Sequence, residues 1–286
     1  MHGPNPTPDR ARTILITGCS SGIGHHAAHA LAARGWRVFA TCRAEADCAS
    51  LRDTGLESLR LDYTDTGSIH AALDDVLGRT GGRLDAVFNN GAYAIPGATE
   101  DLPTDALRAI FETNLFGWHE LTRAVIPVMR AQGAGRIVQN SSVLGLTALR
   151  WRGAYVATKF ALEGLSDVLR LEMAGTGIHV SLIEPGPITS RIRENSIPHF
   201  ERWIDWRNSA RADQYRDHLL ARLYDQRDPD FFELPPEAVT RRLIHAVEAR
   251  WPKPRYAVTT PTRLMGTARR ILPTRALDWL LLKLGP

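Results

Sequence analysis

The sequence predicts a single α/β domain built on a doubly wound parallel sheet, with helices on both faces of the sheet. Two observations lead to this fold class. Short apolar runs rich in β-branched residues alternate along the chain with helical patterns of about 10–15 residues, as in parallel βαβ units. The chain has 286 residues and 44% apolar content, which suffices for one such domain with a sizeable core.

The expected elements follow one another in a regular order from residue 13 onward. Residues 13–17 form a short apolar run typical of a buried parallel strand. The alanine-rich residues 25–34 predict a helix, and further strands are expected at residues 36–41 and 57–61. The later elements are a strand at 84–89, a long helix at about 104–131, a strand at 136–140, a helix containing Tyr155, a strand at 178–184 that ends at Pro185, a helix at 237–250 and a last strand at 255–259.

The turn between the first strand and the first helix carries three glycines. Gly18, Gly22 and Gly24 stand in the strand–turn–helix context of a dinucleotide-binding turn. Glycine lets backbone amides approach a pyrophosphate, and the amino terminus of the helix adds partial positive charge. The spacing is Gly-x-x-x-Gly-x-Gly and not the common Gly-x-Gly-x-x-Gly, so a tight turn without a ligand is the alternative.

Tyr155 and Lys159 form the most informative pair in the chain. Residues four apart lie on one face of a helix, so the phenol and the ammonium can share a site. A free tyrosine has a pKa of about 10, and a neighbouring cation is expected to lower it toward the working range of a catalytic acid or base. Lysine is otherwise rare, because only Lys253 and Lys283 occur besides Lys159.

These motifs together resemble the short-chain dehydrogenase/reductase family over about residues 13–190. The matching residues are Thr17, Gly18, Gly22, Ile23, Gly24, Asn89, Asn90, Asn114, Ser142, Tyr155, Lys159, Pro185 and Gly186. Residues 16–24 and 183–188 look most like the branch that contains 17-beta-hydroxysteroid and retinol dehydrogenases. In two places the chain departs from the family pattern, with Gly91-Ala92 in place of Ala-Gly and Ser190 in place of threonine.

The resemblance implies a catalytic set and a Rossmann-type cofactor site. Tyr155 would exchange the proton, Ser142 would donate to the carbonyl oxygen of the substrate, and Lys159 would bind the nicotinamide ribose. Ser141 is the competing assignment for Ser142. Asn114 would hold a water that links Lys159 to solvent, and a capped or locally kinked helix is the alternative for this asparagine.

The same resemblance implies the residues around the cofactor. They are Gly18, Ser20, Ser21, Gly22, Ile23, Gly24, Arg43, Asp62, Asn89, Asn90, Gly91, Tyr155, Lys159, Pro185, Gly186, Ile188 and Ser190. Asp62 would meet the adenine amino group, and a turn-forming aspartate before Tyr63 is the alternative.

The end of the second strand favours NADP over NAD. Sites specific for NAD place an acidic residue about 20 positions after the glycines. Here Thr41 and Cys42 stand at that place and Arg43 follows, and a guanidinium suits a 2′-phosphate. Glu45 and Asp47 would weaken this argument if the loop folded back.

The chain changes character after residue 190. Residues 190–235 are dense in arginine and aspartate but carry the aromatic residues Phe200, Trp203, Trp206, Tyr215, Tyr224, Phe231 and Phe232. The resemblance implies a substrate-covering insertion there, within an oxidoreductase domain at 13–260. Amphipathic helices that use these aromatics to dock on the core are an equal alternative.

The two ends of the chain differ in composition from the domain. Residues 1–12 hold three prolines and no long apolar run, so we expect a loose leader and not a signal peptide. Residues 261–286 form an amphipathic tail with Trp279 among leucines, arginines and Lys283. This tail is expected to dock on the protein or on a second subunit, and peripheral contact with an anionic membrane is the alternative. The family analogy implies a homodimer or homotetramer.

Composition excludes several other classes of protein. The net charge of +4 is spread along the chain without a basic run, so no nucleic-acid partner is expected. The three cysteines, Cys19, Cys42 and Cys48, cannot all pair and lack C-x-x-C spacing, which indicates no metal and a reducing, cytoplasmic compartment. No apolar stretch reaches the roughly 18 residues needed to span a bilayer.

The function expected from these observations is reversible hydride transfer between NADP(H) and a hydrophobic carbonyl or alcohol of steroid, retinoid or aldehyde type. A regulator or scaffold that binds NADPH without turnover is the alternative. A complete set of asparagine, serine, tyrosine and lysine argues against it, because a sensor would not need the tyrosine.

Overall fold

The computed structural model describes residues 10–225 and 231–284, and a parallel sheet is the centre of this part of the chain. Its seven strands lie in the order β3-β2-β1-β4-β5-β6-β7. They are β1 (Thr13–Ile16), β2 (Arg37–Cys42), β3 (Glu57–Arg60), β4 (Ala86–Asn89), β5 (Gly135–Asn140), β6 (Ile178–Glu184) and β7 (Arg255–Ala257). The strand order reverses between β1 and β4, which is where open α/β sheets bind ligands.

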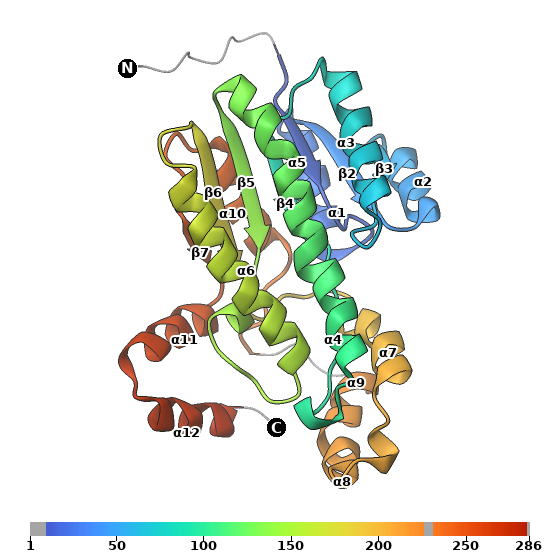
Figure 1. The fold of residues 1–286 in the computed structure, drawn as a ribbon, viewed down its shortest axis with the longest axis vertical. Coiled ribbons are helices and arrows are strands. Elements are labelled where there is room, and N and C mark those ends of the chain that lie inside the picture. The colour runs from blue at the N-terminus through green and yellow to red at the C-terminus, as the bar shows by residue number, and fades with distance from the viewer. Residues whose placement is uncertain (1–9, 226–230, 285–286) are drawn as a thin grey trace.

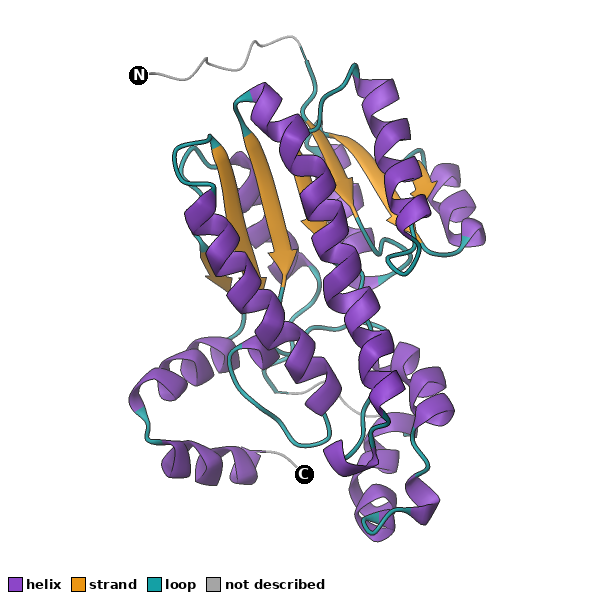
Figure 2. Cartoon of the chain, in the orientation of Figure 1, coloured by secondary structure: helices purple, strands orange, loops and turns teal. Residues whose placement is uncertain are grey.

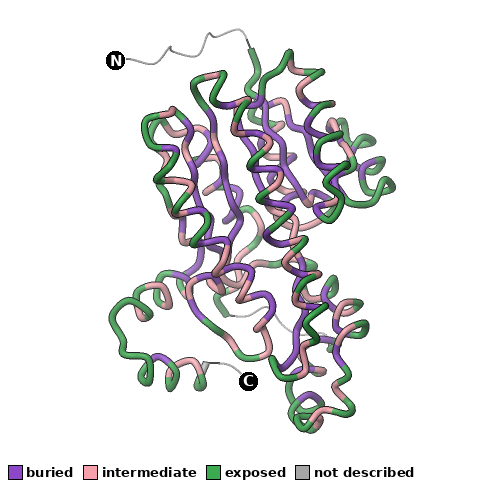
Figure 3. Tube along the Cα trace, viewed as in Figure 1, coloured by how far each residue is buried: buried purple, intermediate pink, exposed green. Residues whose placement is uncertain are grey.

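Helices cover both faces of the sheet (Figure 2). One face carries α1 (Gly22–Ala33), α2 (Glu45–Asp53) and α10 (Glu237–Glu248). The other face carries α3 (Thr66–Thr80), α5 (Gly117–Gln132) and α6 (Gly153–Glu172). Each face has its own apolar core, so β1 and β4 are buried along their whole length (Figure 3). The predicted doubly wound α/β fold is therefore confirmed.

Three parts of this architecture differ from the elements expected from the sequence. The single helix expected at 104–131 is divided into α4 (Thr104–Phe111), a π-helical turn (Glu112–Phe116) and α5. Helices α2 and α3 were not among the expected elements. In α2 the buried residues are Cys48 and Leu51, too few to give a helical period in the sequence.

A group of short helices after β6 lies beyond the carboxyl ends of the strands, beside α4 (Figure 1). It contains α7 (Ile192–Trp203), a 3₁₀ turn (Trp206–Asn208), α8 (Ala212–Gln214), a π-helical turn (Tyr215–Leu220) and α9 (Ala221–Tyr224). We call this group the lid. Residues 226–230 of the expected insertion lie outside the described residues.

Two of the lid's aromatic residues dock it on the domain. Phe200 and Tyr215 are buried, and the Tyr215 hydroxyl donates to Asp101 Oδ2 (2.8 Å) and accepts from the Ala98 backbone N (2.8 Å). Tyr224, Phe231 and Phe232 are exposed. Part of the insertion is therefore docked on the core by its aromatic residues, as one alternative expected. The same insertion also lies over the carboxyl ends of the strands, as the other alternative expected.

Two helices at the end of the chain form an arm that projects from the body (Figure 1). They are α11 (Thr260–Ile271) and α12 (Thr274–Leu284), and Pro273 separates them. Within α12 Leu277 is buried, whereas Ile271 at the end of α11 is 71% exposed and Trp279 is 62% exposed. Among the described residues no helix is long and apolar enough to cross a membrane.

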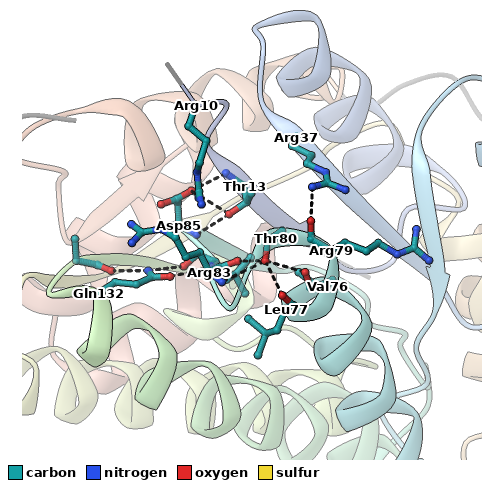
Figure 4. A network of polar contacts seen from close by, with 12 residues as sticks. Arg10, Thr13, Arg37, Val76, Leu77, Arg79, Thr80, Arg83, Asp85 and Gln132 are labelled. Carbon is teal, nitrogen blue, oxygen red and sulfur yellow. Dashed lines mark hydrogen bonds and ion pairs between the residues drawn. The ribbon is translucent and has the colours of Figure 1, made fainter. Parts of the chain in front are cut away.

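The amino-terminal edge of the sheet is held by polar contacts far from the carboxyl ends of the strands (Figure 4). Asp85 Oδ2 accepts from the backbone N (2.7 Å) and Oγ1 (2.9 Å) of Thr13. Gln132 Oε1 accepts from the Leu84 backbone N (2.8 Å). Arg10, from the segment expected to be loose, also donates to Asp85 (3.3 Å). Residues 1–9 of that segment lie outside the described residues.

The cysteines are free and buried. Burial raises the pKa of the Cys19 thiol well above its usual value and that of Cys42 to about 12. Neither group is therefore a reactive thiolate at neutral pH. Within the described residues no cluster of three or more histidine, cysteine, aspartate or glutamate side chains is arranged to hold a metal ion.

Candidate active site

A cavity of about 410 Å³ lies at the carboxyl ends of the strands, between the sheet and the lid. Most residues predicted for the cofactor and for catalysis line it. They are Gly18, Ser20, Ser21, Gly22, Ile23, Asn90, Gly91, Ser142, Tyr155, Lys159, Pro185, Gly186, Ile188 and Ser190. Residues from four strand ends and from α6 therefore meet in one place, as the sheet topology requires.

The glycine turn at the end of β1 leaves no room for side chains. Gly18 has φ of +67°, and a Cβ atom on it would lie 2.5 Å from the Cα of Gly91. A Cβ on Gly24 would lie 2.3 Å from the Gly18 carbonyl oxygen, so this residue packs the helix on the turn and does not line the cavity. Backbone can therefore come close to a ligand here, which fits the pyrophosphate of a dinucleotide.

Asparagine side chains connect this turn to the neighbouring strands. Asn90 Nδ2 donates to the Thr17 carbonyl oxygen (3.0 Å), and Asn140 Nδ2 donates to Asn90 Oδ1 (2.8 Å). Asn89, the other predicted asparagine, is fully buried and accepts a hydrogen bond from the Tyr63 hydroxyl (2.8 Å). Asn90 therefore lines the cavity, whereas Asn89 is buried behind it and contacts Tyr63.

Tyr155 and Lys159 both lie in α6 and face the cavity. Lys159 Nζ donates to the Asn140 carbonyl oxygen (2.7 Å). The same ammonium lies 4.3 Å from the centre of the Trp118 ring and 5.5 Å from that of Tyr155. These contacts fix the ammonium between β5, α5 and the tyrosine.

Burial dominates the ionisation of this pair. It raises the pKa of the Tyr155 phenol well above its usual value, and the Ser142 side chain opposes the shift. Burial also lowers the pKa of Lys159 to about 7, against the attraction of Glu163. Lys159 is not among the groups that shift the pKa of Tyr155, so the expected lowering by the lysine is not found, and burial of the phenol dominates instead.

The structure favours Ser142 over Ser141 as the serine beside the phenol. The Ser142 side chain acts on the phenol and opposes the rise in the pKa of Tyr155, and its hydroxyl accepts from the Leu144 backbone N (3.1 Å). The Ser141 backbone N donates to the Ile183 carbonyl oxygen (2.8 Å), and its buried hydroxyl has no hydrogen-bond partner among the described residues. Both serines line the cavity.

Asn114 lies in the π-helical turn between α4 and α5. Its Oδ1 accepts from the Tyr93 backbone N (3.1 Å), and its Nδ2 donates to the Tyr93 carbonyl oxygen (2.8 Å). The asparagine is fully buried and does not line the cavity. It therefore fastens the loop after β4, and the local kink named as the alternative is present at the same residue.

Besides Gly24 and Asn89, the predicted cofactor residues Asp62 and Arg43 also lie outside the cavity. Asp62 Oδ1 accepts from the backbone N (3.0 Å) and Oγ1 (2.9 Å) of Thr64, which is the turn proposed as the alternative for this aspartate. Arg43 is exposed after β2. Burial lowers the pKa of His199 on α7, and the charge of Arg43 lowers it further.

Sequence reasoning missed three residues of the site. Trp118 and Asn140 contact the Lys159 ammonium, and Arg152 lines the cavity. A signal for Arg152 was available, because it stands three residues before Tyr155, at the start of the helix that carries this tyrosine. No local pattern marks Trp118, which meets Lys159 only in the folded chain.

The chain belongs to the short-chain dehydrogenase family, whose model matches residues 12–199. Within that family it is an oxidoreductase similar to the 17-beta-hydroxysteroid dehydrogenase branch. It is 37% identical over 272 residues to the uncharacterized oxidoreductase YbbO of Escherichia coli, covering 94% of each chain. It is 34% identical over 264 residues to human 17-beta-hydroxysteroid dehydrogenase type 1, covering 87% of this chain and 78% of that one.

A solved structure agrees with this assignment. A short-chain dehydrogenase from Streptomyces avermitilis superposes with a TM-score of 0.75 at 29% identity, covering 97% of both chains. The predicted family and its branch resemblance are thereby confirmed.

Proposed function

We propose that this protein transfers a hydride reversibly between NADP(H) and a hydrophobic carbonyl or alcohol. The observation that carries the proposal is the meeting of Ser142, Tyr155 and Lys159 in the same cavity as the glycine turn. A binding protein without turnover would need the turn but not a buried phenol beside a serine hydroxyl.

The nicotinamide cofactor supplies the hydride for carbonyl reduction and accepts it in alcohol oxidation. The chain's own residues handle the proton. Tyr155 stays protonated at neutral pH because burial raises its pKa, so it can donate its phenolic proton to the carbonyl oxygen. Ser142 and Tyr155 line the same cavity, so both hydroxyls can contact that oxygen. In the oxidative direction Tyr155 must first release its own proton, and its phenolate oxygen then accepts the hydroxyl proton of the alcohol.

Lys159 and Asn114 support this proton exchange. Lys159 Nζ lies beside the Tyr155 ring and has a pKa lowered to about 7, so it can bind or release a proton near neutral pH. Asn114 Nδ2 lies 3.4 Å from Thr158 Oγ1, next to Lys159 in the chain. We assign the proton path from Tyr155 through Lys159 toward the π-helical turn of Asn114.

The preference for NADP is supported by the charges that follow β2. Thr41 is buried and its hydroxyl donates to the Ile16 carbonyl oxygen (3.3 Å), so neither it nor Cys42 offers an acidic group to a ribose hydroxyl. Glu45 is paired with Arg52, which weakens it as a competitor. Arg43 is exposed beside these residues, and its guanidinium matches a 2′-phosphate.

The hydrophobic substrate is supported by the apolar side of the cavity. Beyond the serine and the tyrosine it is lined by Ala94, Pro96, Leu144, Leu149 and Leu223. These side chains offer an apolar surface to a hydrocarbon skeleton, and they offer few partners to the hydroxyl groups of a sugar.

The test is oxidation of NADPH by the purified protein with steroid ketones, retinal, and aliphatic and aromatic aldehydes. We expect turnover with at least one of these hydrophobic classes and none with sugars. Tight binding of NADPH without any turnover across the panel would instead favour a regulator or scaffold.

A further inference from the structure

Arg152 lines the cavity as a half-buried cation, and no counter-ion for it is found among residues 10–225 and 231–284. It precedes α6 as the amino-terminal cap residue and stands one helical turn before Tyr155. Within the part of the chain that the structure describes, its guanidinium forms no hydrogen bond and no ion pair. Arg255, by contrast, is neutralised by Glu163, Asp167 and Glu184.

A like charge acts on Arg152 across the cavity. Burial lowers the pKa of this guanidinium to about 10, and the like charge of Arg222 lowers it further. At neutral pH Arg152 is nevertheless protonated. A cation that is partly removed from water costs free energy when no counter-ion is near, and an anion that enters the cavity would offset that cost.

Most charged residues that line the wider cavity are basic. Besides Arg152 they are Lys159, Arg191, Arg193, Arg222 and Glu233, of which only the last is acidic, and Arg191 is paired with Glu194. Such a surface raises the local concentration of anions and repels cationic ligands.

The backbone holds Arg152 in place at some cost. Trp151 has φ of +66°, a conformation that a bulky side chain rarely adopts. The Trp151 carbonyl oxygen accepts from the Gly97 backbone N (3.0 Å), and its ring lies 4.8 Å from that of Tyr215 in the lid. Strained residues persist where surrounding contacts enforce them, and they concentrate at ligand sites. Arg152 is thus presented from a rigid segment between the loop after β4 and the lid.

We propose that Arg152 binds a carboxylate on the substrate, so that the physiological substrate is a hydrophobic carbonyl or alcohol compound that also bears an acidic group. The inference rests on the proposed function and specifies its substrate. Leu149 and Leu223, which line the cavity with Arg152, would contact the apolar part of the molecule. The planar fork of the guanidinium matches the two oxygens of a carboxylate.

Two aldehydes with the same skeleton test this inference. They are 4-formylbenzoate, which carries a carboxylate at neutral pH, and its methyl ester, which does not. The wild type should reduce 4-formylbenzoate with the higher kcat/KM. Arg152→Met should lower kcat/KM for 4-formylbenzoate by about 10- to 100-fold, the range of a hydrogen bond to a charged group, and change it little for the ester. Arg152→Lys should give an intermediate loss.

Arg216→Met is the matched control. Arg216 is a lid arginine with a side chain 62% exposed and paired with Asp213, and it does not line the cavity. Its removal takes the same charge from the protein, so it should leave the ratio of the two substrates unchanged. An equal loss in both variants would assign the effect to the overall field of the protein and overturn the role of Arg152.

A binding measurement separates this inference from the proposed function. Titration calorimetry with 4-tert-butylbenzoate should show binding to the wild type that Arg152→Met weakens at least tenfold, whether or not any aldehyde is reduced. Turnover of both aldehydes with the same ratio in wild type and Arg152→Met would retain the proposed function and overturn the inference. If neither aldehyde is reduced but the binding of 4-tert-butylbenzoate still depends on Arg152, the role of Arg152 is retained and the proposed function is overturned.

Discussion

Replacing Gly24 by alanine tests how tightly the turn after β1 is packed. The new Cβ would lie 2.3 Å from the Gly18 carbonyl oxygen and 2.8 Å from Asn90 Nδ2. Neither neighbour can move freely, because Gly18 belongs to the backbone of the turn and Asn90 Nδ2 donates to the Thr17 carbonyl oxygen (3.0 Å). We therefore expect the cost of an overpacked site, about 1–3 kcal/mol of unfolding free energy.

Gly164→Ala is the matched control for this substitution. Gly164 lies inside α6 with an exposed position, and a Cβ on it would meet nothing within 4 Å. The same added methyl group should stabilise the protein there by about 0.5–1 kcal/mol, because alanine loses less backbone entropy in a helix. The two variants thus change the stability in opposite directions.

Thermal unfolding followed by circular dichroism measures both effects. Each kcal/mol corresponds to about 2–4 °C in the midpoint for a chain of comparable size. Gly24→Ala should also raise the Kd for NADPH at least tenfold, since displacing the turn moves the amides that would contact the pyrophosphate. A Gly24→Ala protein with wild-type stability and wild-type NADPH affinity would show that the turn is looser than its geometry indicates.

Four further outcomes are expected. Tyr155→Phe should lower kcat by about 100-fold or more with NADPH affinity nearly intact, and a rate near that of the wild type would remove the proton donor from the mechanism. Arg43→Asp should reverse or erase the preference for NADPH over NADH in kcat/KM, and equal use of both cofactors by the wild type would contradict the argument. A lysine in the unfolded chain keeps its proton to about pH 10, whereas buried Lys159 in the folded protein loses its proton above about pH 7. Because the unfolded state then binds more protons, the unfolding free energy of the wild type should rise from about pH 7 to 9 relative to that of Lys159→Met. Urea unfolding at several pH values measures this difference. Truncation before Leu264 should leave the domain folded and lower the oligomeric state in analytical ultracentrifugation; an unchanged state with loss of sedimentation on anionic vesicles would assign the arm to a membrane surface.

Local patterns in the sequence were sufficient for much of the fold. The apolar runs that became β1 and β4 are short and buried on both faces, so their composition alone marks them as parallel strands. The pairing of Tyr155 with Lys159 follows from a spacing of four in a helix, which brings two side chains together whatever surrounds them.

Elements with weak local signals were missed or misjudged. The π-helical turn at Asn114 depends on hydrogen bonds to the backbone of Tyr93, 21 residues away in the chain, so the sequence of the helix does not reveal it. Asn89 and Asn90 are adjacent and look equivalent in the sequence. Because side chains alternate along a strand, Asn90 reaches the cavity and Asn89 is buried against Tyr63.

The sequence by itself determined the fold class, the family and the residues that converge at the carboxyl ends of the strands. Those features depend on periodicity and on spacing along the chain. Only the tertiary structure decided the ionisation of Tyr155 and Lys159, the effect of Arg43 on His199 and the lack of a counter-ion for Arg152 among the described residues. These properties depend on how much water and which charges surround a group, and that environment is supplied by segments distant in the sequence.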